Sequence, residues 1–190
     1  GDTEVIVRIN GLDTPHWQED VRVCVAGGAD GIRIAKCESA EMVRTVDAAV
    51  TAAEKEFGVE EGRTLLMAAL ESPLGIMNAY EIVTASPRMF GCAISGGDFR
   101  KSMHVQIQRD GVEMIVARGQ MLLAARAAGV QCFDTMFPNI DDMEGFKAEV
   151  IQNHKMGFDG KSIVNPKQIA FVHETFAPTE KEIAYAEKLV

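Results

Sequence analysis

The sequence predicts an α/β fold organised around a parallel β-sheet. Short apolar segments alternate along the chain with longer segments whose apolar residues recur every three or four positions, and this alternation is typical of repeated strand–helix units. The 190 residues are 47% apolar and contain no linker-like or low-complexity stretch, which fits one compact domain. We therefore expect residues 1–190 to form a single domain.

The expected strands and helices follow one another in pairs. Strands are expected at residues 5–9, 31–35, 65–70, 89–94, 130–137 and 158–164, and helices at 13–26, 39–57, 76–83, 111–128 and 141–156. Gly58, Gly129 and Gly157 stand where three of these helices should end, because glycine readily adopts the left-handed conformation common at a helix C-terminus. The breaks between elements are thus marked in the sequence itself.

Two capping boxes are expected towards the C-terminus. Thr179 and Glu182 have the spacing of a capping box, which predicts a last helix after residue 179. Asp141 and Glu144 have the same spacing with Asp in the cap position. Each pair therefore indicates where a helix begins.

The connection at residues 99–110 is longer than usual for an α/β unit and contains three cations, Arg100, Lys101 and Arg109. Such connections are commonly two to six residues long, roughly, and longer ones are often functional or mobile. A loop that steers an anionic substrate and a loop that is merely solvated are both consistent with this sequence.

Charge and cysteine usage restrict the class of protein. The formal net charge is −9, which disfavours binding to nucleic-acid phosphates. No apolar run is long enough for a membrane span, and the first residues lack a secretory signal pattern. The cysteines have no C-x-x-C spacing, so we expect buried free thiols in the reducing cytoplasm; they are Cys24, Cys37, Cys92 and Cys132.

Polar side chains follow most of the expected strands. In α/β sheets and barrels the active site lies at the carboxyl ends of the strands and draws on several of them. Turn-forming residues such as Asn need no further explanation, but Arg, Lys and Glu at separate strand ends favour a shared site. The strand-end residues are Arg8, Asn10, Lys36, Glu71, Asp98, Asp134 and Asn165.

Glu71 and Asp98 are candidate metal ligands. Mg²⁺ is commonly held by one or two carboxylates with water and substrate oxygens completing the shell, although two carboxylates could also act as a general acid and base. Gly96 and Gly97 precede Asp98 and could let a ligand approach their backbone N–H groups, or could simply form a tight turn. The four histidines have no metal-binding spacing.

Arg8 and Asp134 are the remaining candidates. The Arg8 guanidinium suits a substrate carboxylate, although an Arg at a strand end can also pair with a neighbouring acid. Asp134 could be a base, a partner that orients Lys36, or a strand terminator, and we favour the partner of Lys36.

Several segments together resemble a known family. The similarity covers the whole chain in order, and the segments are residues 7–10 (VRIN), 69–76 (ALESPLGI), 124–130 (AARAAGV) with 133–135 (FDT), 157–162 (GFDGKS) and 165–169 (NPKQI). They resemble the β subunit of bacterial citrate lyase and, more widely, the HpcH/HpaI aldolase superfamily, which includes malyl- and citramalyl-CoA lyases.

The resemblance implies a TIM (β/α)₈ barrel and Mg²⁺-dependent cleavage of citryl-acyl carrier protein to acetyl-acyl carrier protein and oxaloacetate. It implies that Glu71 and Asp98 hold the metal and that Arg8 contacts the keto acid and thioester. Lys36, Gly96 and Gly97 are expected to bind substrate, Arg8 is expected to be catalytic, and Asp134 is a candidate base.

The resemblance also implies partners: the α subunit, the carrier γ subunit and further copies of the chain in a trimer or hexamer. Gly97 replaces an acidic residue found in many relatives, and Ala35 replaces a proline. A malyl-CoA or citramalyl-CoA lyase and a non-catalytic barrel subunit therefore stay open as alternatives.

The sequence is shorter than a complete (β/α)₈ barrel. Eight βα units need roughly 250 residues, whereas this sequence has 190 and six expected strands. We expect the chain to provide strands three to eight of the barrel and the start of a C-terminal helical region, with the first two βα units missing.

Overall fold

The computed structural model describes residues 3–189 and contains one six-stranded sheet whose strands lie in chain order. All neighbouring strands pair in parallel, which confirms the α/β class and the parallel sheet. The two ends of the expected domain, residues 1–2 and 190, lie outside the described residues. The strands are β1 (Ile6–Arg8), β2 (Gly31–Ile34), β3 (Leu65–Leu70), β4 (Met89–Ile94), β5 (Gln131–Asp134) and β6 (Gly160–Lys161).

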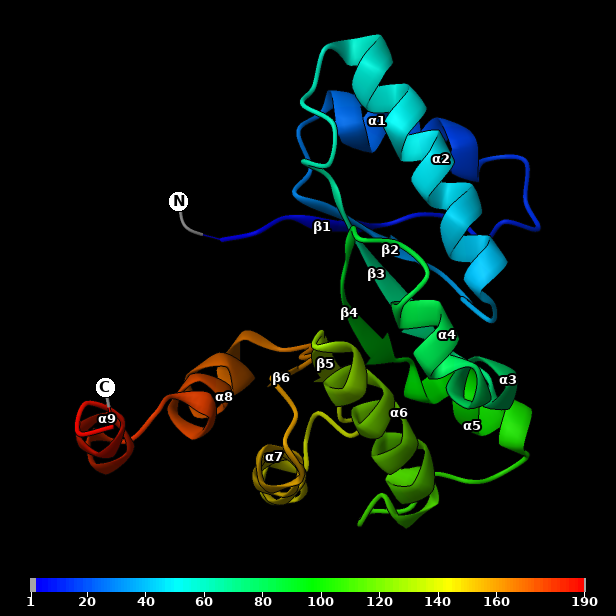
Figure 1. Cartoon of the computed structure of the whole chain (residues 1–190). Helices are drawn as coiled ribbons and strands as arrows, with labels where there is room; N and C mark the ends of the chain where they lie inside the picture. The colour runs from blue at the N-terminus through cyan, green and yellow to red at the C-terminus, as the bar shows by residue number, and fades with distance from the viewer. Residues whose placement is uncertain (1–2, 190) are drawn as a thin grey trace.

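Most of the helices follow one face of the curved sheet as an arc, so that the sheet forms a half-barrel, whereas the last two helices extend away beyond β6 (Figure 1). The 3₁₀ turns are η1 (Val112–Met114) and η2 (Pro166–Gln168). The α-helices are α1 (Trp17–Ala26), α2 (Ala40–Phe57), α3 (Pro73–Met77), α4 (Ala79–Val83), α5 (Gly96–Met103), α6 (Ile115–Ala128), α7 (Met143–Met156), α8 (Ile169–Phe176) and α9 (Glu180–Ala186).

Alternation along each strand separates the core from the concave face. In β2, Ile32 and Ile34 are fully buried and belong to the main apolar core, whereas Arg33 between them is half-buried. Successive strand side chains point to opposite faces, so Arg33 faces away from the helices. The main core therefore lies between the sheet and its helices, and the concave face carries polar groups.

The helix ends agree well with the sequence. Gly58, Gly129 and Gly157 are all left-handed and end α2, α6 and α7. The capping box of Thr179 and Glu182 opens α9. The helix expected from Asp141 differs, because Asp142 is its cap and accepts from the Gly145 N–H at 2.9 Å.

Several elements differ from their expected extents. The fifth strand spans Gln131–Asp134 instead of 130–137, and the first helix begins at Trp17 instead of residue 13. The segment expected as a loop at 99–110 begins with a helix, since α5 spans Gly96–Met103. The single helix expected at 76–83 is two short helices, α3 and α4. The sixth strand pairs over only two residues, Gly160–Lys161.

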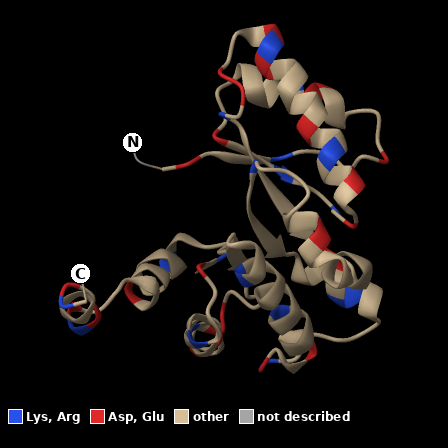
Figure 2. Cartoon of the chain, viewed as in Figure 1, with Lys and Arg blue, Asp and Glu red and all other residues tan. Residues whose placement is uncertain are grey.

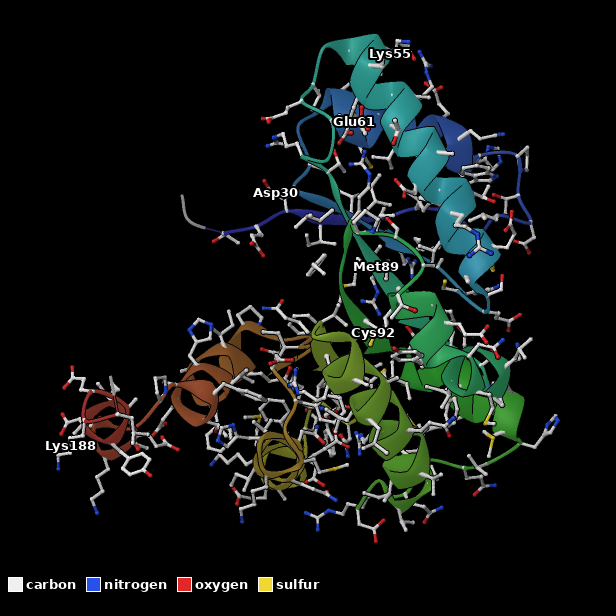
Figure 3. All side chains as sticks on the ribbon, in the orientation of Figure 1. Asp30, Lys55, Glu61, Met89, Cys92 and Lys188 are labelled. Atoms are coloured by element: carbon white, nitrogen blue, oxygen red, sulfur yellow. The ribbon has the colours of Figure 1, made fainter. Side chains whose placement is uncertain are left out.

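All four cysteines are free and buried, as predicted. Cys92 and Cys132 are register partners on β4 and β5 and belong to the main core; Cys92 is labelled in Figure 3. Acidic and basic residues both occur along the outer helices (Figure 2). Among the described residues, no helix is long and apolar enough to cross a membrane.

Candidate functional site

A pocket of about 530 Å³ lies at the carboxyl ends of β2 and β3, beside the start of α5. Three of the predicted site residues meet here: Lys36 follows β2, Glu71 follows β3, and Asp98 lies in the first turn of α5. The lining residues are Lys36, Glu38, Glu71, Ser72, Asp98, Lys101, Ser102 and His104. The rule that strand ends converge thus locates the pocket, although Asp98 is helical rather than strand-terminal.

Glu71 is held in place by the backbone of the neighbouring strand. The Lys36 N–H donates to Glu71 Oε1 at 3.1 Å, and Lys36 has a left-handed backbone with φ of 47°. Such a conformation is uncommon for a residue other than glycine and is often found at functional positions. The turn after β2 therefore presents its N–H to the carboxylate.

Glu71 is buried and lies beside a second carboxylate, that of Asp98. Burial raises the pKa of Glu71; the Lys36 N–H opposes this shift, while the adjacent Asp98 carboxylate adds to it. Glu71 is only 5% exposed. A buried carboxylate beside another acid is a charge arrangement that a bound cation relieves.

The donor set fits Mg²⁺. Both side chains offer hard oxygen ligands, and Mg²⁺ characteristically takes one or two carboxylates and leaves other positions to water or substrate oxygens. Within residues 3–189 there is no group of three or more His, Cys, Asp or Glu placed to hold a metal by themselves. Glu71 and Asp98 would therefore hold the ion jointly with oxygens that the chain does not supply.

The two glycines before Asp98 have different environments. The Gly96 N–H donates to Thr135 Oγ1 at 3.0 Å, and a Cβ at Gly96 would lie 2.7 Å from Arg100 Nη1 and 3.0 Å from Thr135 Cγ2. A Cβ at Gly97 would meet nothing within 4 Å. Gly96 is therefore a close contact between α5 and β5, and its N–H is not free to bind substrate as expected; Gly97 faces open space.

Arg8 lies on β1, is exposed, and is the register partner of Arg33 on β2. Arg33 is a residue that the strand-end rule missed. Its Nη2 donates to Ser95 Oγ at 3.3 Å, and its buried Nε has no partner among the described residues. Burial lowers the pKa of Arg33; Glu71 opposes this, while Arg8 adds to it. A cation in the middle of an apolar strand was the signal available in the sequence.

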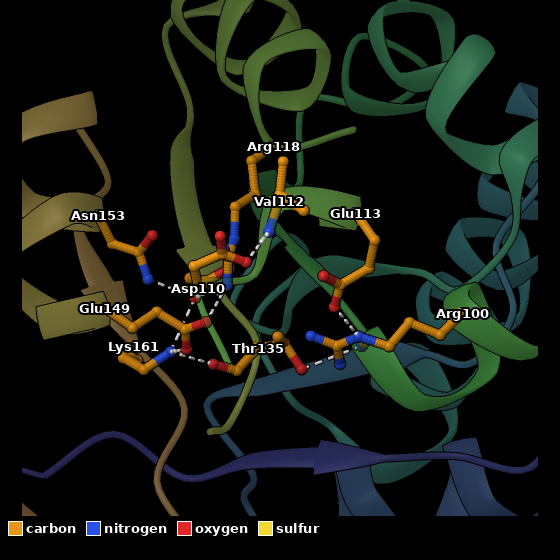
Figure 4. Close-up of polar contacts among 11 residues, drawn as sticks. Arg100, Asp110, Val112, Glu113, Arg118, Thr135, Glu149, Asn153 and Lys161 are labelled. Atoms are coloured by element: carbon orange, nitrogen blue, oxygen red, sulfur yellow. Dashed lines mark hydrogen bonds and ion pairs between the residues drawn. The ribbon is translucent and has the colours of Figure 1, made fainter. Parts of the chain in front are cut away.

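Asp134 lies elsewhere, in a buried polar cluster on the helix side of the sheet. Its carboxylate accepts from Arg118 Nε at 2.8 Å, Arg118 Nη2 at 2.9 Å and Lys161 Nζ at 2.8 Å, and also from the Asn153 amide. Glu149 pairs with both cations, at 2.9 Å and 2.6 Å. Figure 4 shows Arg118, Glu149, Asn153 and Lys161 converging from α6, α7 and β6.

The surroundings of Asp134 correct the expectation that it orients Lys36. Burial opposes its ionisation, but Lys161 and Arg118 outweigh that effect and hold the pKa of Asp134 below its usual value. A carboxylate with a lowered pKa and two cationic partners is a poor proton acceptor. Its contacts are those of a structural ion cluster.

The cluster also touches the backbone beside the pocket. Lys161 Nζ donates to the Thr135 carbonyl at 2.7 Å, and Thr135 Oγ1 accepts from Gly96. A chain of contacts therefore runs from the buried cluster through Thr135 to the first turn of α5, where Asp98 lies.

Two of the three cations at 99–110 are already paired. Arg100 Nε lies 2.5 Å from the Glu113 carboxylate, and Arg109 Nε lies 2.6 Å from the Asp142 carboxylate. Lys101 lines the pocket and is exposed. Of the two alternatives for this segment, steering of an anionic substrate therefore stays open for Lys101 alone among these three cations.

The sequence profile of the HpcH/HpaI aldolase/citrate lyase family matches residues 1–166. This chain belongs to that family. The resemblance inferred from the motifs is thereby confirmed.

Individual relatives within the HpcH/HpaI family agree. The chain is 48% identical over 190 residues to citrate lyase subunit beta of Leuconostoc mesenteroides subsp. cremoris, covering 100% of this chain and 63% of that protein. It is 41% identical to the citrate lyase subunit beta of Escherichia coli K12, with coverages of 100% and 63%. An L-malyl-CoA/beta-methylmalyl-CoA lyase of Rhodobacter capsulatus is 32% identical, with coverages of 100% and 66%. The chain thus spans somewhat less than two thirds of the citrate lyase relatives.

Solved structures show the same architecture. RipC of Yersinia pestis superposes with a TM-score of 0.84 at 25% identity, covering 95% of this chain and 80% of that one. The citrate lyase beta subunit of M. tuberculosis, complexed with oxaloacetate and magnesium, superposes with a TM-score of 0.75 at 26% identity, with coverages of 91% and 73%. The half-barrel of this chain therefore has the same arrangement as the matching parts of these solved structures.

Proposed function

We propose that this chain carries the catalytic half-barrel of a Mg²⁺-dependent carbon–carbon lyase that cleaves citryl-acyl carrier protein to acetyl-acyl carrier protein and oxaloacetate. The observation that carries the proposal is the pair of carboxylates, Glu71 and Asp98, that line one pocket at the carboxyl end of the sheet. The higher identity to citrate lyase β subunits than to the malyl-CoA lyase supports the choice of substrate.

The proposal extends to the fold. The six strands correspond to strands three to eight of a (β/α)₈ barrel, and the chain forms one barrel domain together with the start of a C-terminal helical region. The consecutive strand order and the one-sided arc of helices support this assignment, because a barrel of eight parallel strands has this order throughout.

The residues of the pocket have distinct tasks. Glu71 and Asp98 would hold Mg²⁺, which would supply Lewis-acid polarisation of substrate oxygens. The Lys36 N–H fixes the orientation of Glu71. Lys36 lines the pocket that the substrate would enter, and Gly97, where a Cβ would meet nothing within 4 Å, would leave room for the substrate beside Asp98.

Arg8 stabilises the charge that develops as the carbon–carbon bond breaks. Its exposed guanidinium lies on the strand next to β2 and can meet a carboxylate and the thioester oxygen, whose charge increases as the enolate forms. Because Asp134 is committed to Arg118 and Lys161, we assign no proton transfer to it.

The assembly is inferred from the relatives. The name "subunit beta" of the relatives supports a complex, and we infer the α subunit, the carrier γ subunit and a homotrimeric or homohexameric arrangement of this chain. Four free, buried cysteines support a reducing compartment, the cytoplasm.

The test replaces each proposed ligand by its amide. Glu71→Gln and Asp98→Asn should weaken Mg²⁺ binding at least tenfold in calorimetric titrations and lower turnover by about 100-fold or more, because each change removes an anionic ligand. Glu41→Gln, on the exposed side of α2, is the control and should bind Mg²⁺ as the wild type does.

Three outcomes distinguish the proposed citryl lyase from the two alternative functions. Wild-type turnover by Glu71→Gln in excess Mg²⁺ would remove the metal assignment. Faster cleavage of malyl-CoA or citramalyl-CoA than of citryl-acyl carrier protein would favour the CoA-lyase alternative, for which the Rhodobacter capsulatus relative is the precedent. Absence of Mg²⁺ binding by the wild type would favour a non-catalytic barrel subunit.

A further inference from the structure

Arg33 is a half-buried cation, with a buried Nε, that the proposed chemistry does not use. It lies in the middle of β2, on the concave face of the sheet. Its hydrogen bond from Nη2 to Ser95 Oγ is long, at 3.3 Å, and its buried Nε has no partner within the described residues. A guanidinium offers five N–H donors, and buried donors left without partners are rare enough to require an explanation.

The buried arginines show how this chain usually satisfies a guanidinium. Arg88, Arg100 and Arg118 each pair with a carboxylate at 2.5–2.8 Å. Within residues 3–189, Arg33 and its register partner Arg8 form no ion pair within 4.0 Å. Two neighbouring cations on the concave face are therefore left without an acid of their own.

Their position places this unpaired charge beside the proposed metal site. Glu71 is close enough to Arg33 to interact with its charge, and Ser95 immediately precedes the turn of α5 that bears Asp98. An anion held by Arg33 would thus lie next to the carboxylate pair. Since two like charges side by side repel, an anionic ligand also relieves the contact between Arg8 and Arg33.

We propose that Arg33 is a specificity-determining residue that binds the second free carboxylate of the substrate's keto-acid half. This inference rests on the proposed lyase function. A citryl thioester has two free carboxylates and yields the dicarboxylate oxaloacetate, whereas a malyl thioester has one and yields a monocarboxylate. In this proposal the metal and Arg8 bind one carboxylate of the keto-acid half. Arg33 binds the second carboxylate, which the citryl thioester has and the malyl thioester lacks.

The test compares two keto acids that differ by this carboxylate. Freshly dissolved oxaloacetate and pyruvate are titrated calorimetrically into the chain in the presence of Mg²⁺. The wild type should bind oxaloacetate more tightly. Arg33→Met, which removes the charge but keeps an unbranched side chain, should weaken oxaloacetate binding about 30-fold and pyruvate binding less than twofold, since one charge-assisted contact is lost.

A conservative variant separates charge from packing. Arg33→Lys keeps a single charge without the planar fork and should recover part of the preference for oxaloacetate. Cleavage of citryl and malyl thioesters should follow the same order, with kcat/KM for the citryl substrate falling selectively in Arg33→Met. Circular dichroism and thermal unfolding identify any variant that has lost its fold.

The outcomes distinguish this inference from the proposed function. Equal weakening of both keto acids in Arg33→Met, or no weakening of either, overturns the inference while citryl cleavage by the wild type still stands. If the wild type binds Mg²⁺ and prefers oxaloacetate but cleaves no citryl thioester, the proposed function fails. Arg33 is then still supported as a dicarboxylate-binding residue if Arg33→Met removes that preference.

Discussion

The pKa of Asp134 is low because two cations, Lys161 and Arg118, lie beside its carboxylate. Arg118 and Asp134 are both fully buried, and Lys161 and Glu149 complete a cluster of two cations and two anions. Removing one member of such a cluster leaves a buried charge uncompensated, which costs far more than the whole cluster contributes relative to an apolar replacement. The cluster is therefore sensitive to single substitutions.

Asp134→Asn should lower the free energy of unfolding by about 3 kcal/mol at pH 7, because Arg118 and Lys161 would then share only Glu149. Urea denaturation followed by circular dichroism measures the change. Asp141→Asn, which alters an exposed carboxylate further along the chain, is the control and should change stability little. Mg²⁺ binding by folded Asp134→Asn should equal that of the wild type; a loss of binding with unchanged stability would restore a direct role in the site.

The same substitution should change the pH dependence of stability. The pKa of Asp134 is lowered in the folded state, so its ionisation stabilises the fold above the unfolded-state pKa of about 3.9. That contribution is lost as the pH falls through the folded-state pKa. The difference in unfolding free energy between wild type and Asp134→Asn should therefore be largest near neutral pH and shrink on acidification below about pH 4. A constant difference down to low pH would contradict the lowered pKa.

Among the elements, α5 carries the second proposed metal ligand and depends on its contact with β5. Thr135 accepts the Gly96 N–H and is itself held through its carbonyl by Lys161. The contact fixes the first turn of α5, in which Asp98 lies. Support of this kind affects the affinity of a metal site without touching the metal.

Thr135→Val keeps the shape of the side chain but removes the oxygen that accepts from Gly96. We expect Mg²⁺ affinity to fall about tenfold and the unfolding free energy to fall by about 1 kcal/mol. Calorimetric titration and urea denaturation measure the two effects. Thr45→Val, on the exposed face of α2, is the matched control. Loss of stability with unchanged Mg²⁺ affinity would show that the Gly96 contact does not position Asp98.

The elements that the sequence predicted best are those with the strongest apolar signal. β3 and β4 have the expected bounds, 65–70 and 89–94, because each is a buried apolar run followed directly by polar residues. α5 was not predicted because two glycines and several cations conceal it. Packing of Phe99, which is 3% exposed, and the Arg100–Glu113 pair stabilise this helix, and neither contact is visible in local sequence.

The site, too, was predicted where local sequence was informative and missed where tertiary structure decides. Lys36, Glu71 and Asp98 were predicted together because parallel strands bring their carboxyl ends to one edge. Asp134 also ends its strand, but strand alternation puts it on the face of Cys132, toward the helices. Arg33 lies in mid-strand and escaped a rule that considered only ends. Which face a strand residue occupies, rather than its distance from the strand end, decides whether it reaches the site.

For the whole molecule, the continuity of the core decides whether the half-barrel behaves as one unit. A single cluster of buried apolar residues extends from Ile9 after β1 to Phe158 before β6. Trp17 on α1 and Met121 on α6 both belong to or pack against it, although they lie on helices far apart in the chain. A core shared in this way predicts cooperative unfolding of the whole chain.

Met121→Ala tests this cooperativity from a distance. Met121 is fully buried, and its truncation should lower the unfolding free energy by about 2–4 kcal/mol through lost burial and a residual cavity. The chain has one tryptophan, so fluorescence reports on α1 alone, while far-UV circular dichroism reports on all helices. We expect both signals to move to the same lower urea midpoint.

Val50→Ala in α2 is the matched variant at the other end of the half-barrel. Val50 is also fully buried, and its truncation should shift both midpoints in the same manner. A Trp17 midpoint that stays fixed in Met121→Ala, with a biphasic circular dichroism curve, would show that the two ends of the half-barrel unfold independently and that the chain is not a single domain.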